Sequence, residues 1–421
     1  MTGYPVSPAQ PSEASVSLEQ HPTAFQKRVI LLTASAVVLD GLDNQILGFA
    51  IPAVIKDWNI ARDAFAPILA ASLLAMIIGT AIGGIAGDRL GRRVTLIGSM
   101  LVFALGTGLM SMTNTLPGFA ALRLIAALGL GSTMPNATAL LAEYAPARHK
   151  NLAISAGIVG VPVGGLLGGA LAASLLPAFG WRVLFAAGGC MPLVVAAAMA
   201  VGLPASPSST RKDTPLIDRS HALRAIFSPS IRRDTAFLWL AFFGSLFAVY
   251  LVFNWAPTLL SSVGFGLRAS SSGLASFNFG GVIAAIIGGG LMDRYGSRPP
   301  LIIAALLGGT VAAAVAAHGL DSADGVVFAT VVFGLLGAFV AGLQVMLFAL
   351  AAHVYPVRAR AAGVGLALAV GRLGAVLGAF AGATILRIGV PGYFGAIAGA
   401  MAMAALAIAL VSRHTSNARG T

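Results

Sequence analysis

Residues 84–93 read GIAGDRLGRR, and a degenerate copy of this segment, GGLMDRYGSR, occupies residues 289–298. The two copies begin 205 positions apart. A second motif recurs at nearly the same offset, because AEYAPARHK at 142–150 returns as AHVYPVRAR at 352–360. Two unrelated motifs that recur at nearly the same spacing indicate a chain built from two similar halves in the same order.

The composition is that of a membrane protein. Of 421 residues, 57% are hydrophobic and only 10% are charged, whereas a soluble domain carries about 25% charged residues. The 52 glycines suit closely packed transmembrane helices. The net charge of +12 comes from basic residues scattered among short loops, which argues against nucleic-acid binding. The single cysteine, Cys190, lies in an apolar run, so we expect a buried thiol and no intrachain disulfide.

Apolar windows long enough to cross a bilayer, about 20 residues each, occur twelve times. They fall at 29–52, 65–86, 94–113, 117–140, 151–176, 182–203, 235–260, 270–291, 300–318, 325–351, 361–386 and 392–411.

One substantial polar interruption separates the first six windows from the last six. We therefore predict an all-α membrane protein of twelve transmembrane helices, in two six-helix bundles related by a parallel repeat. The predicted parts are a disordered cytoplasmic tail (1–26), a first bundle (27–203), a cytoplasmic linker (204–234), a second bundle (235–412) and a short cytoplasmic tail (413–421).

Lysine and arginine positions set the predicted orientation. With both termini in the cytoplasm, 19 of the 26 basic residues face the cytoplasm and 5 face outward. Cytoplasmic loops of membrane proteins carry this excess of positive charge. The sequence therefore predicts that both termini are cytoplasmic.

Two aspartates, Asp40 and Asp43, lie inside the first apolar window, in LDGLDNQILGFAIP (39–52). A carboxylate at the bilayer centre costs about 2.5–3.5 kcal/mol on insertion scales, so such residues face the protein interior and are usually functional. At a spacing of three residues they share one helix face, and we expect them to couple transport to protons. The alternative is a structural pair that binds a helix end or a basic partner. Gly41 between them is expected to let the helix bend.

The segment at 84–93 matches throughout the Gly-x-x-x-Asp-Arg-x-Gly-Arg-Arg loop of the major facilitator superfamily, which the chain resembles from Lys27 to Ser412. Within that superfamily it looks like the aromatic acid:proton symporters, among them transporters of hydroxybenzoate and of hydroxyphenylpropionate. This resemblance rests on DGLD at 40–43, ALRLIAALGLGSTMPNAT at 121–138, EYAPAR at 143–148, FNWAP at 253–257 and AVGRLGA at 369–375.

The resemblance implies a monomeric carrier in a bacterial inner membrane that imports an aromatic carboxylate together with protons. Such a substrate needs a fixed positive partner, and the guanidinium fork of arginine matches a carboxylate. We expect Arg372 to bind it and Arg123 to pair with one of the aspartates during the cycle; the alternative for each is a static ion pair. Further substrate contacts are expected from Tyr250, Asn254, Trp255 and Gln344, and candidates also include Phe277 and Asn278, although aromatic residues in helices more often serve packing.

Charged loop residues at the cytoplasmic surface lie too shallow for substrate and are predicted to gate the transporter by holding and releasing helix ends. These are Asp88, Arg89, Gly91, Arg92, Arg93, Glu143, Arg148, Asp293, Arg294 and Arg358.

Other functions fit less well. A proton-coupled exporter of drugs or organic acids is the main alternative, although Val161 interrupts the Gly-Pro dipeptide of exporters in GIVGVPVGG (157–165). A membrane enzyme or sensor would need a catalytic cluster or an appended domain, and neither is present in the sequence. We expect no cofactor and no metal site, because neither a phosphate-binding loop nor a metal-ligand spacing occurs.

Overall fold

The computed structural model describes residues 24–144, 150–203, 226–229, 231–356 and 359–414, and all of its regular elements are helical. The helices are α2 (Ala24–Trp58), α3 (Phe65–Leu90), α4 (Arg92–Met110), α5 (Leu116–Tyr144), α6 (Lys150–Gly202), α8 (Arg232–Ser262), α9 (Leu267–Tyr295), α10 (Arg298–His318), α11 (Gly325–Leu336), α12 (Gly342–Val354), α13 (Arg360–Arg387) and α14 (Val390–Leu410). Short turns η1 (Arg62–Ala64), η3 (Ser322–Asp324) and η4 (Gly337–Ala341) complete the described elements.

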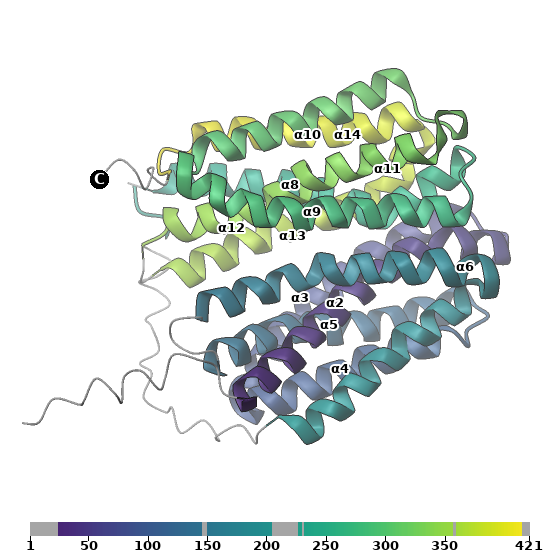
Figure 1. The fold of residues 1–421 in the computed structure, drawn as a ribbon, viewed down its shortest axis with the longest axis horizontal. Coiled ribbons are helices and arrows are strands. Elements are labelled where there is room, and N and C mark those ends of the chain that lie inside the picture. Colours follow the sequence, from purple (N-terminus) through teal and green to yellow (C-terminus); the bar gives the residue numbers. More distant parts are fainter. Residues whose placement is uncertain (1–23, 145–149, 204–225, 230, 357–358, 415–421) are drawn as a thin grey trace, which may run out of the picture.

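Eleven helices in the described residues are long and apolar enough to cross a membrane, one fewer than the twelve windows. The difference lies in α6, where the windows at 151–176 and 182–203 form one continuous element with a break at Gly180. Gly180 has φ 77° and ψ 179°, a conformation that glycine adopts without steric cost. Figure 1 shows α6 turning back on itself, so its two arms form a hairpin.

The helices lie in two groups side by side (Figure 1). In the first group α2 packs against α6, and α5 packs against α3 and α4. In the second group α8 packs against α13 and α14, and α10 packs against α14. Between the groups, α2 meets α8, α3 meets α13 and α6 meets α9. A path between the two groups would therefore be lined by these six helices.

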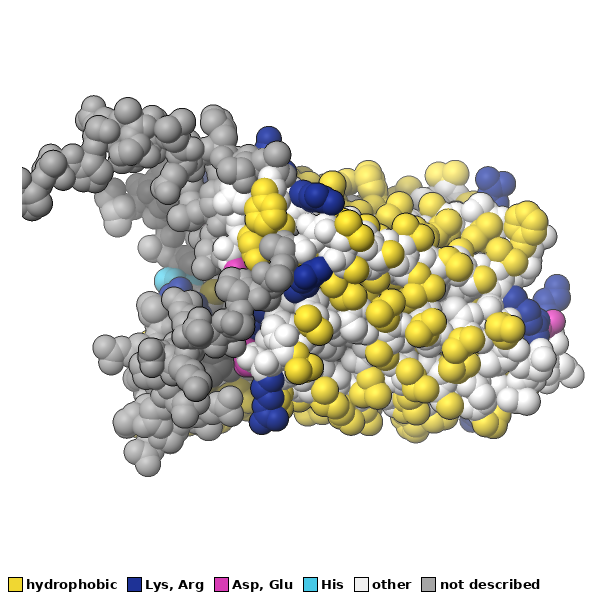
Figure 2. All heavy atoms as spheres, turned by 90° about the horizontal axis from the view of Figure 1, so that it is seen from below, with side chains coloured by type: hydrophobic (Ala, Val, Ile, Leu, Met, Phe, Trp, Pro, Cys, Tyr) yellow, Lys and Arg dark blue, Asp and Glu magenta, His cyan; other side chains and the backbone are white. Residues whose placement is uncertain are grey.

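Apolar side chains cover the outside of the bundle. Figure 2 shows them over a broad belt between bands of basic side chains. Many large ones are exposed, such as Ile78 at 54% and Ile286 at 70%. A soluble protein rarely exposes so much contiguous apolar surface, and lipid is the surrounding that suits it. Cys190 belongs to this exposed surface, so the prediction that it is buried is wrong.

Glycines allow α2 and α6 to come into backbone contact. A Cβ added at Gly41 would lie 2.2 Å from the carbonyl oxygen of Val161 on α6, and one at Gly164 would lie 1.9 Å from that of Val38 on α2. The chain stays helical through Gly41. In this conformation Gly41 serves the close packing of α2 on α6.

The window at 325–351 is not a single α-helix. It contains α11, the π-helical turn η4 and α12. At Gly337 a Cβ would lie 1.8 Å from the carbonyl oxygen of Phe277, so α9 passes directly against this turn. A π-helical turn inside a helix is rare and often marks a functional position.

An equivalent arginine contact occurs in both groups of helices. Arg93 donates a hydrogen bond to the carbonyl oxygen of Ala200 at the end of α6, and Arg298 donates one to that of Ala409 at the end of α14, at 3.0 Å. The preceding loops match as well, since Gly91 has φ 91° and Gly296 has φ 77°. An arginine near the last turn satisfies free carbonyl groups and opposes the helix dipole. This recurrence is consistent with the internal repeat of the sequence.

Candidate functional site

A buried ion pair joins two helices of the first group. Arg123 on α5 donates from Nη1 to Oδ2 of Asp43 on α2 at 2.9 Å, and the two side chains are 3% and 0% exposed. Thr107 on α4 donates its hydroxyl to the other carboxylate oxygen. Of the two aspartates that sequence reasoning left open as partners of Arg123, the structure places Asp43 there.

Asp40 lies one turn away in a different environment. Its side chain is 6% exposed, and its buried Oδ1 has no hydrogen-bond partner among the described residues. The charges that act on it belong to Asp43, Arg372 and Arg123. The two aspartates therefore differ, because Asp43 is fully engaged and Asp40 holds an unpartnered oxygen.

Arg372 reaches from the second group to the first. Its Nη1 donates to Oγ1 of Thr80 on α3 at 3.0 Å. This bond uses one of the five N–H groups of a guanidinium. Arg372 is half-buried, unlike Arg123. It therefore combines a position on the boundary between the groups with donors for a further anion.

Tyr250 on α8 belongs to the same region, and we call Asp40, Asp43, Arg123, Arg372 and Tyr250 the central layer. Its hydroxyl accepts a hydrogen bond from Nδ2 of Asn44 on α2 at 3.2 Å. Tyr250 is also within electrostatic reach of Asp40, Arg123 and Arg372. Asn44 follows Asp43 directly, but no sequence pattern singled it out.

The other predicted substrate residues have unequal environments. Trp255 is fully buried between helices, where its Nε1 donates to the carbonyl oxygen of Ala379 at 2.9 Å and its ring lies against Gly382. It packs α8 on α13 and does not line the central layer. Asn254 is buried and donates to the carbonyl oxygen of Tyr250 at 2.8 Å.

Gln344 on α12 is 8% exposed, and neither its Nε2 nor its Oε1 has a hydrogen-bond partner in the part of the chain that the structure describes. Buried polar atoms are nearly always hydrogen-bonded, so an orphaned amide needs an explanation.

An amide pair connects the two groups beside this layer. Gln45 on α2 donates to Oδ1 of Asn278 on α9 at 3.1 Å, and Asn278 donates to Oε1 of Gln45 at 2.7 Å. Both side chains are buried, and a Cβ added at Gly165 of α6 would lie within 2.5 Å of both. We call Gln45 and Asn278 the amide clasp. Asn278 was a sequence candidate for substrate contact, and its partner Gln45 was not recognised.

The two ends of the bundle differ in how the groups meet. At the end near Trp58, Asp63 of η1 forms an ion pair with Arg387 of α13. At the end near Gly91, a cavity of about 340 Å³ separates Val159 of α6 from Ala285 and Met292 of α9 and from Phe348 of α12. Ligand pockets begin at about this size. A second cavity between the groups, of about 520 Å³, lies at the Trp58 end, where Asp57, Trp181 and Leu267 are among the residues that line it.

The predicted gating residues lie at the Gly91 end, where described. Arg92 forms an ion pair with Asp88, and Arg93 contacts the end of α6. Arg89, Asp293, Arg294 and Glu143 are exposed, and the guanidinium of Arg294 lies 5.2 Å from the ring centre of Tyr295. Arg148 and Arg358 lie outside the described residues.

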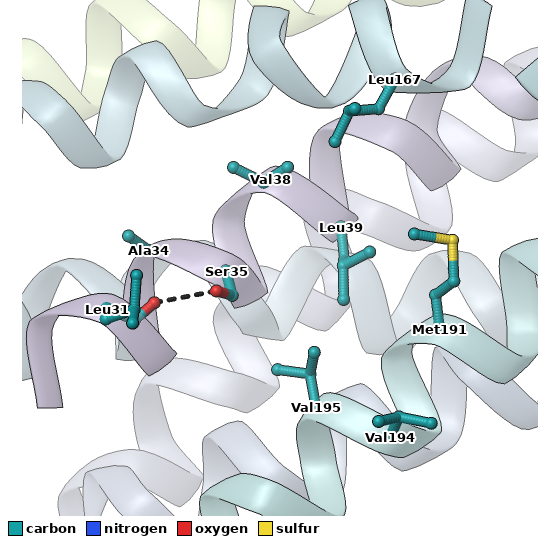
Figure 3. A pocket seen from close by; sticks show the side chains of 9 residues that line it. All are labelled: Leu31, Ala34, Ser35, Val38, Leu39, Leu167, Met191, Val194 and Val195. Carbon is teal, nitrogen blue, oxygen red and sulfur yellow. Dashed lines mark hydrogen bonds between the residues drawn. The ribbon is translucent and has the colours of Figure 1, made fainter. Parts of the chain in front are cut away.

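Another pocket, of about 520 Å³, lies between α2 and the two arms of α6 (Figure 3). Leu31, Val38, Leu167 and Val194 line it without any charged side chain. Its one polar side chain, Ser35, donates to the carbonyl oxygen of Leu31 at 2.9 Å. This pocket offers no partner for an anion or a proton, so we do not include it in the candidate site. No group of three or more metal-binding side chains was found among the described residues.

Comparison with known proteins agrees with this architecture. The sequence model of the Major Facilitator Superfamily matches residues 33–335 and 274–420. Among solved structures, a D-xylose-proton symporter superposes with a TM-score of 0.76 at 18% identity, over 94% of this chain and 100% of that one. An inward-open conformation of the xylose transporter XylE from E. coli gives a TM-score of 0.74, at 18% identity, over 94% and 98% of the two chains. At this identity the likeness concerns the fold.

Curated relatives are closer in sequence. The 4-hydroxybenzoate transporter PcaK of Pseudomonas putida is 36% identical over 88% of this chain and 89% of its own length. The 3-(3-hydroxy-phenyl)propionate transporter of Escherichia coli is 32% identical over 94% of this chain and 97% of its own. A gallate transporter of Pseudomonas putida is also 32% identical, over 87% of each chain. The chain therefore belongs to the major facilitator superfamily, and it is a transporter rather than an enzyme.

Proposed function

We propose that this protein is a proton-coupled importer of an aromatic carboxylate of the hydroxybenzoate or hydroxyphenylpropionate type. The observation that carries the proposal is the central layer, in which Asp40, Asp43 and Arg123 of the first group face Tyr250 and Arg372 of the second. The aromatic acid class is supported by the relatives, which are transporters of 4-hydroxybenzoate, gallate and 3-(3-hydroxyphenyl)propionate.

The charges suggest a division of roles. Arg372 binds the substrate carboxylate, because it is half-buried and has donors to spare. Asp40 takes up the proton, because its unpartnered oxygen would otherwise carry a charge in a dry site close to the incoming anion. Asp43 and Arg123 neutralise each other and fix the position of α2. A proton and an anion bound together lower the cost of exposing the site to the other side of the membrane.

The remaining substrate contacts follow from the same layer. Tyr250 and Gln344 offer polar atoms, and Asn254 adds a buried amide. Trp255 is not included, because it packs between helices.

We further propose the arrangement in the membrane. The two arms of α6 count as two crossings, which gives twelve in two six-helix bundles at 27–203 and 235–412. Both termini and the Gly91 end face the cytoplasm, in line with the distribution of basic residues. The protein acts as a monomer in a bacterial inner membrane. On this orientation the ion pair of Asp63 with Arg387 joins the two groups on the outer side, and the cycle requires a second conformation in which that side opens.

The loop residues act as gates in that cycle. Asp88 with Arg92 stiffens the turn at Gly91, and Arg93 holds the end of α6. Release of these contacts would accompany the change of conformation. Arg89, Asp293, Arg294, Glu143, Arg148 and Arg358 belong to the same proposal.

Uptake tests the proposal directly. Cells that express the protein are given a panel of labelled aromatic acids with and without a protonophore, beside Asp40→Asn. We expect saturable uptake of at least one acid that is lost in both controls. Absence of uptake, combined with reduced accumulation of preloaded acids in expressing cells, would favour the exporter and contradict import.

A further inference from the structure

The buried side chain of Gln344 carries an amide that nothing in the described structure uses. An amide offers two donors and can accept at its oxygen, and both atoms of Gln344 are buried without a partner. Such burial is unfavourable unless a partner arrives in another state of the protein. A bound substrate would supply that partner.

The helix register places Gln344 at the depth of Arg372. Helices α12 and α13 meet at the turn near Ala359, and the ring of Tyr355 lies against Gly363 on the other side of that turn. Gln344 lies 10 positions before the last residue of α12, Val354, and Arg372 lies 12 positions after the first residue of α13, Arg360. At 1.5 Å per residue these two helical stretches differ in length by about 3 Å, so the two residues lie at similar depth.

A contact between α12 and α8 also relates the depth of Gln344 to that of Tyr250. Phe348 packs against Phe242, with ring centres 5.4 Å apart. Because α8 and α12 run in opposite directions, Gln344, one turn before Phe348, lies level with the position one turn after Phe242, and Tyr250 follows about one further turn along α8. Gln344, Tyr250 and Arg372 therefore lie within about one helical turn of a common level.

Gln344 borders the cavity between the two groups without lining it. Phe348 lines that cavity, which has a volume of about 340 Å³. Residues four apart lie above one another on a helix, so Gln344 lies one turn deeper than Phe348, beyond the residues that line the cavity. The π-helical turn η4 ends directly before α12, three residues ahead of Gln344, and such turns often occur at functional positions.

We propose that Gln344 recognises a ring hydroxyl of the substrate and makes the transporter selective for hydroxylated aromatic acids. This inference rests on the proposed function, in which Arg372 holds the carboxylate. A phenolic hydroxyl both donates and accepts, which matches an amide, whereas a second carboxylate could only accept. An unhydroxylated ring would leave the amide unpaired, and sites built to bind a hydroxyl discriminate strongly against the analogue that lacks it.

Paired uptake measurements test this inference. The transport efficiencies for 4-hydroxybenzoate, 3-hydroxybenzoate and benzoate are compared in the wild type, in Gln344→Met and in Leu347→Met. Leu347 is the matched control, because it is a fully buried residue of α12 that does not line the cavity. We expect the wild type and the control to prefer a hydroxylated acid by at least about tenfold, equivalent to about 1.4 kcal/mol. In Gln344→Met that preference should disappear through loss of hydroxy-acid transport, with benzoate unchanged.

A second variant and a second measurement cover loss of expression. Gln344→Asn keeps the amide but shortens its reach, and it should fall between the wild type and Gln344→Met. Binding of the same three acids to the purified wild type, measured by its thermal stabilisation, needs no variant. Equal affinity for benzoate and the hydroxylated acids would overturn the inference and leave the proposed function standing. Absence of uptake and binding for all three acids would overturn the proposed function and this inference with it.

Discussion

Arg123 and Asp43 form an ion pair of 2.9 Å in which neither side chain is more than 3% exposed. It joins α5 to α2 within the first group of helices and lies one turn from Asp40. Breaking a buried pair by removing one partner costs about 3–5 kcal/mol, because the remaining charge is left uncompensated. Variants of this pair therefore test its contribution to the stability of the protein.

Neutralising one partner should destabilise the protein more than neutralising both. We expect Asp43→Asn and Arg123→Gln each to lower the unfolding temperature of the purified protein, and the double variant to regain most of the loss. Size-exclusion chromatography after heating measures this. A double variant as unstable as the sum of the single ones would show that the pair does not act as a unit.

Asp40 should be needed for coupling and dispensable for folding. Its Oδ1 has no hydrogen-bond partner among the described residues, so Asp40→Asn removes no hydrogen bond of that atom. We expect normal amounts of folded protein, loss of proton-driven accumulation, and retained exchange of external for internal substrate. Retained accumulation that still collapses with a protonophore would assign the proton to another residue.

Replacing Arg372 by lysine should weaken substrate binding, although lysine keeps the positive charge. Lysine lacks the planar pair of donors that matches a carboxylate. Hydrogen bonds to charged groups contribute about 1.5–3 kcal/mol, which corresponds to roughly 10- to 100-fold in affinity. We expect Arg372→Lys to raise the KM for uptake by such a factor and Arg372→Gln to raise it further. Thr80→Val, which removes the present partner of Arg372, is the control and should leave the KM within about threefold of wild type, since the lost bond is with a neutral hydroxyl.

Two glycines with opposite surroundings test the packing of α2 on α6. A Cβ at Gly41 would lie 2.2 Å from the carbonyl oxygen of Val161, whereas one at Gly98 on α4 has no heavy atom within 4 Å. We expect Gly41→Ala to lower the unfolding temperature and impair transport, because the backbones must separate. Gly98→Ala should be neutral or slightly stabilising, since alanine favours a helix by about 1 kcal/mol. Equal stability of the two variants would contradict the close approach.

The sequence predicts the helices well but not the directions of their side chains. Windows such as 65–86 and 300–318 agree with α3 and α10 to within a few residues, because a bilayer demands long apolar runs. The prediction that Cys190 is buried is wrong for the same reason: residues that face lipid and residues that face the core are both apolar. The π-helical turn at 337–341 left no composition signal, since its residues, GAFVA, are as apolar as those of the helices on either side.

In the candidate site, the sequence indicates the charged residues but not their neutral polar partners. Asp40, Asp43, Arg123 and Arg372 stand out in a sequence because a charge inside a membrane is costly. The partners Asn44, Thr80 and Thr107 do not stand out, because neutral polar residues are common in such helices and only the fold brings them into contact.

The amide clasp provides the last prediction, which concerns conformation. Gln45 and Asn278 exchange two hydrogen bonds across the boundary between the groups, in the halves of α2 and α9 that lie toward the Trp58 end. A state that opens at the Trp58 end has to separate them. Replacing one partner leaves a buried amide unpaired at a cost of about 1–3 kcal/mol, which destabilises the contact between the groups at that end. We therefore expect Gln45→Leu and Asn278→Leu each to shift the population toward the outward-open state. The double variant, Gln45→Leu with Asn278→Leu, should shift it less, because apolar contact replaces the lost bonds.

Spin labels at the Trp58 end of each group, in a Cys190→Ser background, would report the distance distribution between the groups. Thr310→Val on α10 removes an exposed hydroxyl bonded within its own helix and should leave the distribution unchanged. If the single variants matched this control, the clasp would not contribute to closure.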